Sequence, residues 1–146
     1  MKDTELNLTE PGRYRICGAP EGVDARALAA LARNRGGAVL HVARDDARMA
    51  ALGGALDFFA ADLPVLQVPA WDCLPYDRVS PNADLSARRM DSLGRLAGRT
   101  EDDGPLVVLT TVNAMLQRLP SRDFVAEARF PLKVGERLDR EALQTY

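Results

Sequence analysis

The chain has 146 residues, 47% of them hydrophobic, which is enough for one domain with its own core and the beginning of another. Its charges nearly cancel, with 19 Lys plus Arg against 21 Asp plus Glu, and this balance excludes a global positive field that would attract nucleic acid or an anionic membrane. Cys17 and Cys73 are far apart in the sequence and His41 is the only histidine. We therefore expect no metal site and no histidine-based triad.

Neither the first residues nor any later stretch has the apolar length of a signal sequence or of a membrane span. The composition predicts a cytoplasmic protein with reduced thiols and no membrane contact.

Short apolar runs alternate with segments of helical period, which is typical of a parallel sheet covered by helices. Because the runs are apolar almost throughout, both faces of the sheet should be covered. The prediction is an α/β fold of three layers, with helices on both faces. Its four strands are expected at residues 14–17, 38–43, 64–70 and 106–111.

Three helices are predicted between these strands, the first over residues 25–33 with Asp24 as its N-cap and the third with Asp84 as its N-cap. The apolar spacing of the second and third helices predicts which side chains face the sheet. These inward residues are Met49, Leu52, Leu56 and Phe59 in the second helix and Met90, Leu93, Leu96 and Ala97 in the third.

After Pro120 the pattern changes, and residues 124–146 predict one or two short strands followed by the start of a capped helix at Asp139. We interpret residues 1–123 as one α/β domain and residues 124–146 as the beginning of a second, α+β domain. On this interpretation the chain ends at a boundary or a cleavage point inside that second domain.

The turn after the first predicted strand is where such a fold would carry a phosphate-binding loop of the form G-x-x-x-x-G-K-[ST]. Counting from Gly18, the positions of the second Gly, the Lys and the hydroxyl hold Val23, Asp24 and Ala25, although Gly22 could still form a tight turn. A carboxylate in place of the lysine repels phosphate, and there is no hydroxyl for magnesium. The loop predicts the geometry of a nucleotide fold without its chemistry.

The proline-rich stretch at residues 68–81 concentrates polar and aromatic side chains directly after a predicted strand. Cys73 has no activating partner, and His41 is expected inside a strand as a packed residue. Trp71 and Tyr76 are interpreted as anchors that cover a sheet edge, with Asp77 and Arg78 clamping the loop. This pattern favours a structural role over catalysis.

The segment PAWDCLPYDRVSPNADL, followed by a helix and then by VVLTTVNAMLQRLP, resembles the N-terminal region of the bacterial transcription-repair coupling factors. A looser match runs through residues 131–143. At positions 87–89 the family often has Ser-Glu-Arg where this chain has Ala87, Arg88 and Arg89, so a salt bridge made by that glutamate is not expected here. The residues that carry the family motif, in structural roles, are Trp71, Pro75, Tyr76, Asp77, Arg78, Asp84, Arg89, Thr110, Thr111, Gln117 and Arg118.

The resemblance implies a large ATP-driven DNA translocase that removes stalled RNA polymerase and recruits the repair protein UvrA. Its ATP and magnesium would belong to a motor further along the chain, and its first domains are similar to those of UvrB, with a nucleotide site that has been lost. Residues 1–123 would then correspond to the first UvrB-like domain, and the UvrA contacts would lie mainly beyond Tyr146.

Two hypotheses follow for the chain itself. The first is a non-catalytic scaffold and interaction module that binds no cofactor. The alternative is an ATP-using, helicase-type domain or a DNA-binding part of one. Val23, Asp24 and Ala25 and the lack of surplus positive charge favour the first hypothesis.

Overall fold

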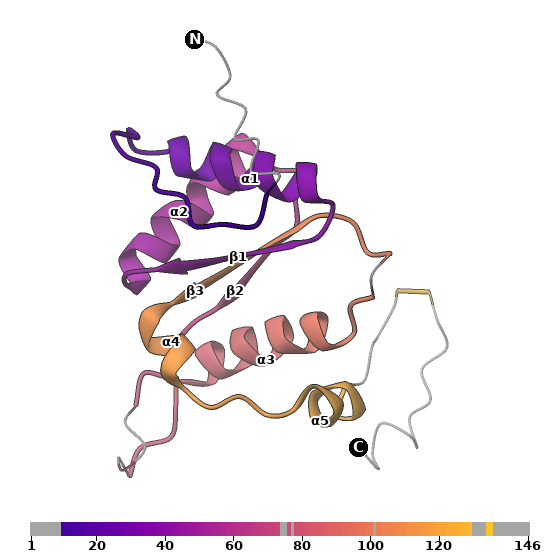
Figure 1. Ribbon diagram of the computed structural model, residues 1–146. Coiled ribbons are helices and arrows are strands. Elements are labelled where there is room, and N and C mark those ends of the chain that lie inside the picture. Colours follow the sequence, from indigo (N-terminus) through magenta and orange to yellow (C-terminus); the bar gives the residue numbers. More distant parts are fainter. Residues whose placement is uncertain (1–9, 74–75, 77, 101, 130–133, 136–146) are drawn as a thin grey trace.

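The computed structural model describes residues 10–73, 76, 78–100, 102–129 and 134–135. Within them the chain forms a parallel three-stranded sheet with helices on both faces, as Figure 1 shows. The strand order is β1-β3-β2, so the last strand in sequence is the central one. The strands are β1 (Ala38–Ala43), β2 (Val65–Val68) and β3 (Leu106–Thr111).

The register of the sheet shows where each strand begins and ends relative to its neighbour. Ala38 lies opposite Leu106 and Ala43 opposite Thr111, so β1 and β3 are paired along their whole length. β2 pairs with β3 from Val65, opposite Val107, to Val68, opposite Thr110. All six residues of β3 are buried, because this strand has a neighbour on each edge and helices over each face.

The helices form two layers, with α1 and α2 on one face of the sheet and α3 and α5 on the other (Figure 1). The short α4 follows β3 directly at the end of the sheet. The helices are α1 (Val23–Arg35), α2 (Asp46–Phe59), α3 (Ala83–Ala97), α4 (Val112–Leu116) and α5 (Arg122–Glu127).

The larger core lies between the sheet and the layer of α1 and α2. Helix α1 presents Ala25, Ala29 and Ala32 to it, and these small side chains let the helix axis approach the sheet closely. Helix α2 contributes longer side chains, so it fills more of this core than α1 does. The buried members of this core are Ala25, Ala29, Ala32, Ala43, Met49, Leu52, Leu56, Ala60, Leu63, Val107 and Leu109.

The second core, on the α3 side, is smaller. Four strand residues, Leu66, Val68, Leu106 and Val108, are buried there, with Leu93 and Leu96 of α3 packed against them. This core is small because α3 also turns two polar residues toward the sheet.

The predicted α/β class, the parallel strands and the helices on both faces are confirmed. The predicted strand at residues 14–17 is wrong, since these residues belong to no strand and are exposed, Tyr14 at 51% and Ile16 at 56%. Four residues with two large apolar side chains satisfy the pattern of a strand, but a strand also requires a hydrogen-bonding neighbour, and within the described residues this segment has none.

The helix caps lie two residues before the predicted ones. α1 begins at Val23 with Gly22 as N-cap, and Asp24 lies in its first turn. α3 begins at Ala83, and the side chain of its N-cap Asn82 accepts from the Asp84 backbone N–H at 2.9 Å, so Asp84 is not the cap. In both cases a residue two positions earlier takes the cap position.

The inward faces were predicted correctly for Met49, Leu52 and Leu56, which are buried. Phe59, the last residue of α2, is 48% exposed, so its predicted inward position is wrong. Met90 is 42% exposed, and the neighbouring Arg89 is buried in its place. The spacing of apolar residues predicted the wrong inward residue in this part of α3, because the buried position is taken by a polar side chain.

The segment after Pro120 begins as a helix, not as the predicted strand. Ser121 caps α5 by accepting from the Phe124 backbone N–H at 3.3 Å, and the helix packs beside α3. α5 crosses the expected boundary between residues 123 and 124, while the division into two domains stays a prediction. The helix start expected at Asp139 lies outside the described residues.

Candidate functional site

The carboxyl edge of the sheet is where open parallel folds bind ligands. Several helices begin there, among them α1 after the turn at residues 18–22 and α2 shortly after β1. The positive ends of the α1 and α2 dipoles therefore point toward the place where a phosphate would lie.

The turn before α1 uses its two glycines as predicted. Gly18 has φ of 70° and Gly22 has φ of 85°, a backbone region that disfavours residues with a side chain. Gly22 is the N-cap and provides no side-chain hydrogen bond to the helix. The chemistry of this turn depends on the side chains that follow.

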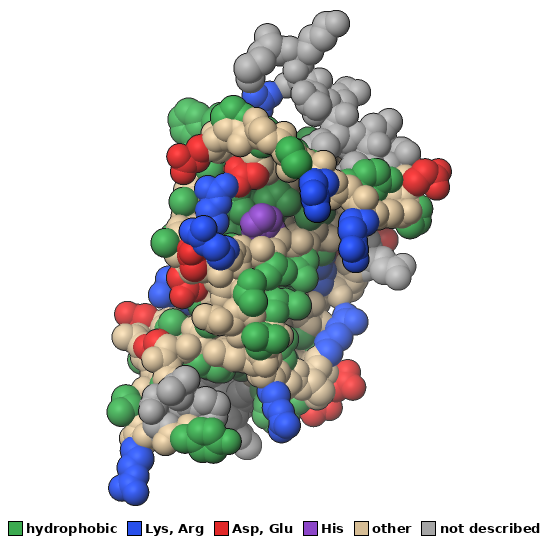
Figure 2. Space-filling model, turned by 60° about the vertical axis from the view of Figure 1, so that its left-hand side comes forward, with side chains coloured by type: hydrophobic (Ala, Val, Ile, Leu, Met, Phe, Trp, Pro, Cys, Tyr) green, Lys and Arg blue, Asp and Glu red, His purple; other side chains and the backbone are tan. Residues whose placement is uncertain are grey.

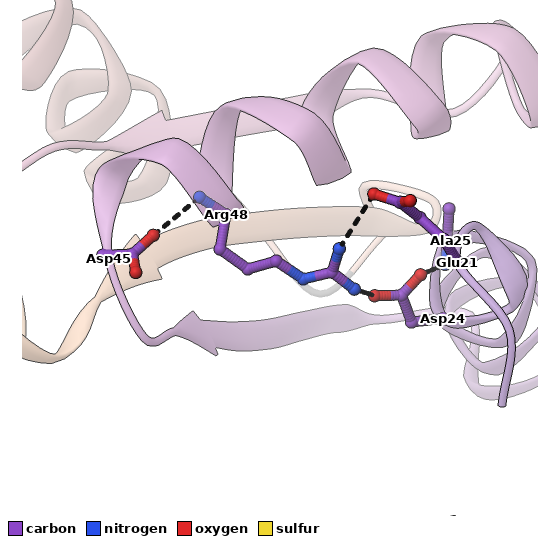
Figure 3. A network of polar contacts seen from close by, with 5 residues as sticks. All are labelled: Glu21, Asp24, Ala25, Asp45 and Arg48. Carbon is purple, nitrogen blue, oxygen red and sulfur yellow. Dashed lines mark hydrogen bonds and ion pairs between the residues drawn. The ribbon is translucent and has the colours of Figure 1, made fainter. Parts of the chain in front are cut away.

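Asp24 brings a carboxylate to the start of α1, as Figure 3 shows. Its Oδ1 accepts from the Ala25 backbone N–H at 3.0 Å, and its Oδ2 forms an ion pair and hydrogen bond with Nη2 of Arg48. Glu21 adds a second carboxylate, with Oε1 3.8 Å from Nη1 of Arg48. The site predicted at Gly18–Ala25 is therefore connected to α2 through Arg48, a residue that the sequence did not single out.

Arg48 is held in place by the first turn of α2. Its backbone N–H donates to Oδ1 of Asp45, the N-cap of α2, at 2.8 Å (Figure 3). Asp45 Oδ2 accepts from Arg44 Nε at 2.8 Å. These two contacts, the helix cap foremost, hold the pKa of the Asp45 carboxyl below its ordinary value of 3.8. A capped first turn fixes the position from which Arg48 reaches Asp24.

This arrangement puts negative charge where a phosphate-binding loop needs positive charge. The first turn of α1 holds one carboxylate and the preceding loop another, and the nearest guanidinium already pairs with both. The helix dipole stabilises Asp24 as it would stabilise an anionic ligand. A bound phosphate would have to displace Asp24 from Arg48 and would meet two negative charges, Glu21 and Asp24.

His41 lies next to this network, in β1, with its side chain half-buried. Figure 2 shows it at the surface, with acidic and basic side chains interspersed around it and hydrophobic side chains below it. Burial lowers the pKa of the His41 imidazole below its ordinary value of 6.5, Asp24 opposes that shift and Arg48 adds to it. The imidazole is therefore neutral at pH 7.

A second polar cluster lies where β2 ends, on the α3 face. Arg89 is only 1% exposed, and its guanidinium carbon lies 4.9 Å from the centroid of the half-buried Trp71 ring. Nη1 of Arg89 donates to the carbonyl of Pro69, whereas its Nη2 is buried without a partner among the described residues. The Trp71 backbone N–H donates to Oε1 of Gln117 at 3.0 Å. Three family-motif residues are thereby brought together from separate segments.

Buried hydroxyl groups form further hydrogen bonds in the same region. Ser92 Oγ donates to the carbonyl of Gln67 at 2.6 Å, and Thr110 Oγ1 donates to the carbonyl of Val68 at 2.9 Å. Thr111 caps α4 by accepting from the Ala114 backbone N–H at 3.2 Å. Through these hydrogen bonds, the end of β2 is connected to the rest of the sheet, to the following loop and to the neighbouring helices. They assign structural roles to Thr110 and Thr111.

Several predicted site residues do not join either cluster. Tyr76 is 96% exposed, so its predicted role as a packed anchor is wrong, whereas Trp71 is half-buried and contacts Arg89 of α3. Arg78 and Arg118 are exposed. Pro75 and Asp77 lie outside the described residues, and with Asp77 the predicted clamp to Arg78. Asp84 takes part in the cap of α3 through its backbone N–H, which donates to the Asn82 side chain.

The sequence did not single out Arg48, Asp45 or Ser92. A usable signal existed for Asp45, because an Asp directly after an apolar strand and before a helical pattern is a common N-cap. For Ser92 no local signal exists, since its partner Gln67 is 25 residues away. In the described part of the chain no group of three or more His, Cys, Asp or Glu residues could hold a metal ion. No helix there is long and apolar enough to cross a membrane.

The fold and the first site define a parallel α/β domain in which a carboxylate and arginine pair joins the first turns of α1 and α2. No protein-family model matches the chain. It is 32% identical over 135 residues to the transcription-repair-coupling factor of Escherichia coli (strain K12), a match of 92% of this chain and 11% of that protein.

Two other relatives carry the same name. The transcription-repair-coupling factor of Rickettsia conorii is 31% identical over 48% of this chain and 6% of that protein, and the one of Mycobacterium tuberculosis is 36% identical over 64% and 8%. The chain belongs to the family of transcription-repair-coupling factors, as its motifs predicted. It spans about a tenth of the length of the E. coli relative.

Trp71→Ala should lower the free energy of unfolding by about 2 kcal/mol, because the packing of the indole and its contact with Arg89 are lost. This is less than for a fully buried indole, since Trp71 is partly exposed. Tyr76→Ala is the matched control, an aromatic residue of the same loop that is 96% exposed and should change stability little. Urea unfolding monitored by circular dichroism measures both variants. Equal effects of the two changes would contradict the assignment of Trp71 as the anchor.

His41 should titrate below its ordinary pKa of 6.5. The lowered pKa means that the unfolded chain binds the proton more readily, so the contribution of His41 to stability is complete above about pH 6.5 and decreases as the pH falls toward the folded pKa. As the chain has one histidine, its ring protons give the pKa directly by NMR. His41→Gln should flatten the dependence of unfolding free energy on pH between about 7 and 5.5, and a measured pKa above 6.5 would overturn the prediction.

Proposed function

We propose that this chain is a non-catalytic scaffold and interaction module of a transcription-repair-coupling factor. The observation that carries the proposal is the Asp24–Arg48 pair at the start of α1. It fills the place that a nucleotide phosphate would take in a fold of this kind, and it joins α1 to α2 across the same edge of the sheet.

The charge of the region supports this proposal. A phosphate-binding loop stabilises its ligand through backbone N–H groups, a lysine and a hydroxyl that holds magnesium. At the corresponding positions the chain has Asp24 and Ala25, and the Ala25 N–H is already bonded to the Asp24 carboxylate. The Ala25 backbone N–H, which could otherwise donate to a phosphate, therefore already donates to the Asp24 carboxylate.

The larger role follows from the family. We propose that the longer protein displaces stalled RNA polymerase and recruits UvrA, and that its ATP, magnesium and DNA contacts belong to other parts of it. In this proposal the domain resembles the first domain of UvrB, and the protein works in the cytoplasm. The similarity to the transcription-repair-coupling factor of E. coli over 92% of this chain supports that role.

The second candidate is an ATP-using or DNA-binding domain. In its favour are the parallel sheet and the helix N-termini at the carboxyl edge. Against it stands the acidic first turn of α1, because DNA and ATP are both polyanions and would meet Glu21 and Asp24 there.

Titration of the chain with Mg-ATP in a calorimeter should give no saturable heat, because the lysine and hydroxyl positions hold Asp24 and Ala25. Asp24→Asn is the matched control, since it removes the negative charge and keeps the size of the side chain while releasing Arg48. Binding of Mg-ATP by the unchanged chain at low micromolar concentration would favour the second candidate.

UvrA should be captured weakly or not at all by this 146-residue chain, whereas the full-length E. coli relative should capture it. The reason is that our proposal assigns the UvrA contacts to parts of the longer protein outside the tenth of the E. coli relative that this chain matches. Side-by-side pull-downs with equal amounts of the two proteins measure the difference. Full-strength capture by the short chain would place the contact surface within it and would contradict the division of roles proposed here.

A further inference from the structure

An open pocket of about 410 Å³ lies where α3 ends, and its lining residues are Leu96, Arg99, Thr100 and Arg122. The two arginines come from separate segments, Arg99 from the residues just after α3 and Arg122 from the start of α5. Figure 1 shows α5 beside the C-terminal half of α3, so both residues reach the same place. The pocket therefore brings two positive charges together at the end of one helix.

Part of each guanidinium binds backbone carbonyls. Arg122 donates from Nε to the Ala97 carbonyl at 3.1 Å and from Nη2 to the Arg99 carbonyl at 2.9 Å. Nη2 of Arg99 donates to the carbonyls of Asp103 and Gly104. These contacts satisfy carbonyls at the end of α3 and in the loop before β3. A guanidinium has five N–H donors, and in the part of the chain that the structure describes Nη1 of both arginines has no hydrogen-bond partner.

A third guanidinium lies over Gly98, the C-cap of α3. A Cβ atom placed on Gly98 would be 1.6 Å from Nη1 of Arg129, so this arginine lies directly against the glycine backbone. The two carbonyls that accept from Arg122 belong to the residues on either side of Gly98. The guanidinia of Arg122 and Arg129 are therefore close to each other at the same helix end.

These three positive charges are not neutralised by ion pairs. None of the three arginines forms an ion pair with a carboxylate among the described residues. The carboxylate of Asp103 accepts from the Thr100 backbone N–H at 2.7 Å. The C-terminus of a helix supplies only about half an elementary negative charge. The pocket thus has an excess of positive charge, although the formal net charge of the chain is -2.

We propose that this pocket binds a carboxylate side chain of a partner protein. Arg99 and Arg122 provide the N–H groups, and the planar pair of carboxylate oxygens matches the geometry of a guanidinium. Leu96 provides an apolar wall for the methylene groups that carry the carboxylate of a glutamate. Arg129 adds a third positive charge beside them.

Acidic residues around the pocket favour a single carboxylate over a nucleic-acid strand. Asp102 and Asp103 follow Thr100 in the loop before β3, and Asp123 follows Arg122 in α5. All three acidic residues are exposed. A nucleic-acid strand has a charge at every nucleotide, so the phosphates next to a bound one would be repelled by these carboxylates. A lone carboxylate side chain brings one charge and places it at the arginines.

This site goes beyond the proposed loss of the nucleotide site. It lies before the start of β3 at Leu106, whereas the Asp24–Arg48 pair lies at the carboxyl edge of the sheet. Binding of a carboxylate here and failure to bind Mg-ATP are therefore separate results, and either can be wrong without the other.

An NMR titration of the isotope-labelled chain measures the binding directly. The probe is N-acetylglutamate N-methylamide, a single glutamate with both backbone ends capped. The control probe is the corresponding glutamine compound, which has nearly the same shape and no charge. The glutamate probe should cause saturable shifts at the backbone amides of residues 96–100 and 122, with a Kd of about 1 mM, as expected for a ligand of this size. The glutamine probe should not saturate.

A pair of arginine variants locates the binding. Arg99→Gln should weaken the binding of the glutamate probe about tenfold, because a charge-assisted hydrogen bond is lost. Arg95→Gln is the matched control, since Arg95 is an exposed arginine of α3 that pairs with Asp91 and does not line the pocket. It should leave the affinity unchanged. The comparison of the two probes on the unchanged chain tests the proposal even where Arg99→Gln disturbs the loop before β3.

Saturation by the glutamate probe alone, weakened in Arg99→Gln and kept in Arg95→Gln, supports the proposal. An equal response to both probes, or no saturation by either, overturns it. Equal weakening in both variants also overturns it, because binding would then follow the net charge and not the pocket. Shifts of the same amides at micromolar single-stranded oligothymidylate would replace the protein carboxylate by a nucleic-acid contact.

Discussion

The pairing of β3 with a strand on each of its edges is the interaction on which the rest of the structure depends. Every residue of β3 is buried, and the strand contributes Val107 and Leu109 to one core and Leu106 and Val108 to the other. Since the last strand in sequence lies between the first two, neither β1 nor β2 has a strand neighbour among the described residues until residues 106–111 are in place. Both layers of helices are thereby arranged around a segment that comes late in the chain.

The two layers are held to this sheet by different chemistry. α1 and α2 bury small and medium apolar side chains, which favours close packing and adapts readily to small changes in shape. α3 makes polar contacts to carbonyl groups at and after the end of β2, from Ser92 to Gln67 and from Arg89 to Pro69. Hydrogen bonds of this kind are directional, so they determine where α3 lies along the sheet. The loop that contains Trp71 is fixed at the same place, where β2 ends.

On our proposal the carboxyl edge keeps the backbone of an anion site, with two positive-φ glycines before α1, while the Asp24 carboxylate takes the place of the anion. Arg48 then links the two helices that border the edge. On our proposal the ligand-binding geometry of a parallel α/β fold is retained here because an internal ion pair stabilises it in the place of a ligand.

The sequence by itself determined the α/β class, the bounds of β1 and β3 and the family, because continuous apolar runs and two long motifs are local signals that need no knowledge of distant residues. The tertiary structure decided which of the patterns that resemble strands found a neighbour: residues 38–43 did and residues 14–17 did not, although both are apolar. It also decided that Arg89 is buried and Met90 exposed, since the Pro69 carbonyl and the Trp71 ring that receive the guanidinium lie about 20 positions away in sequence. Hydrogen-bond partners and ring contacts of that kind come from separate segments, so the periodicity of one helix does not contain them.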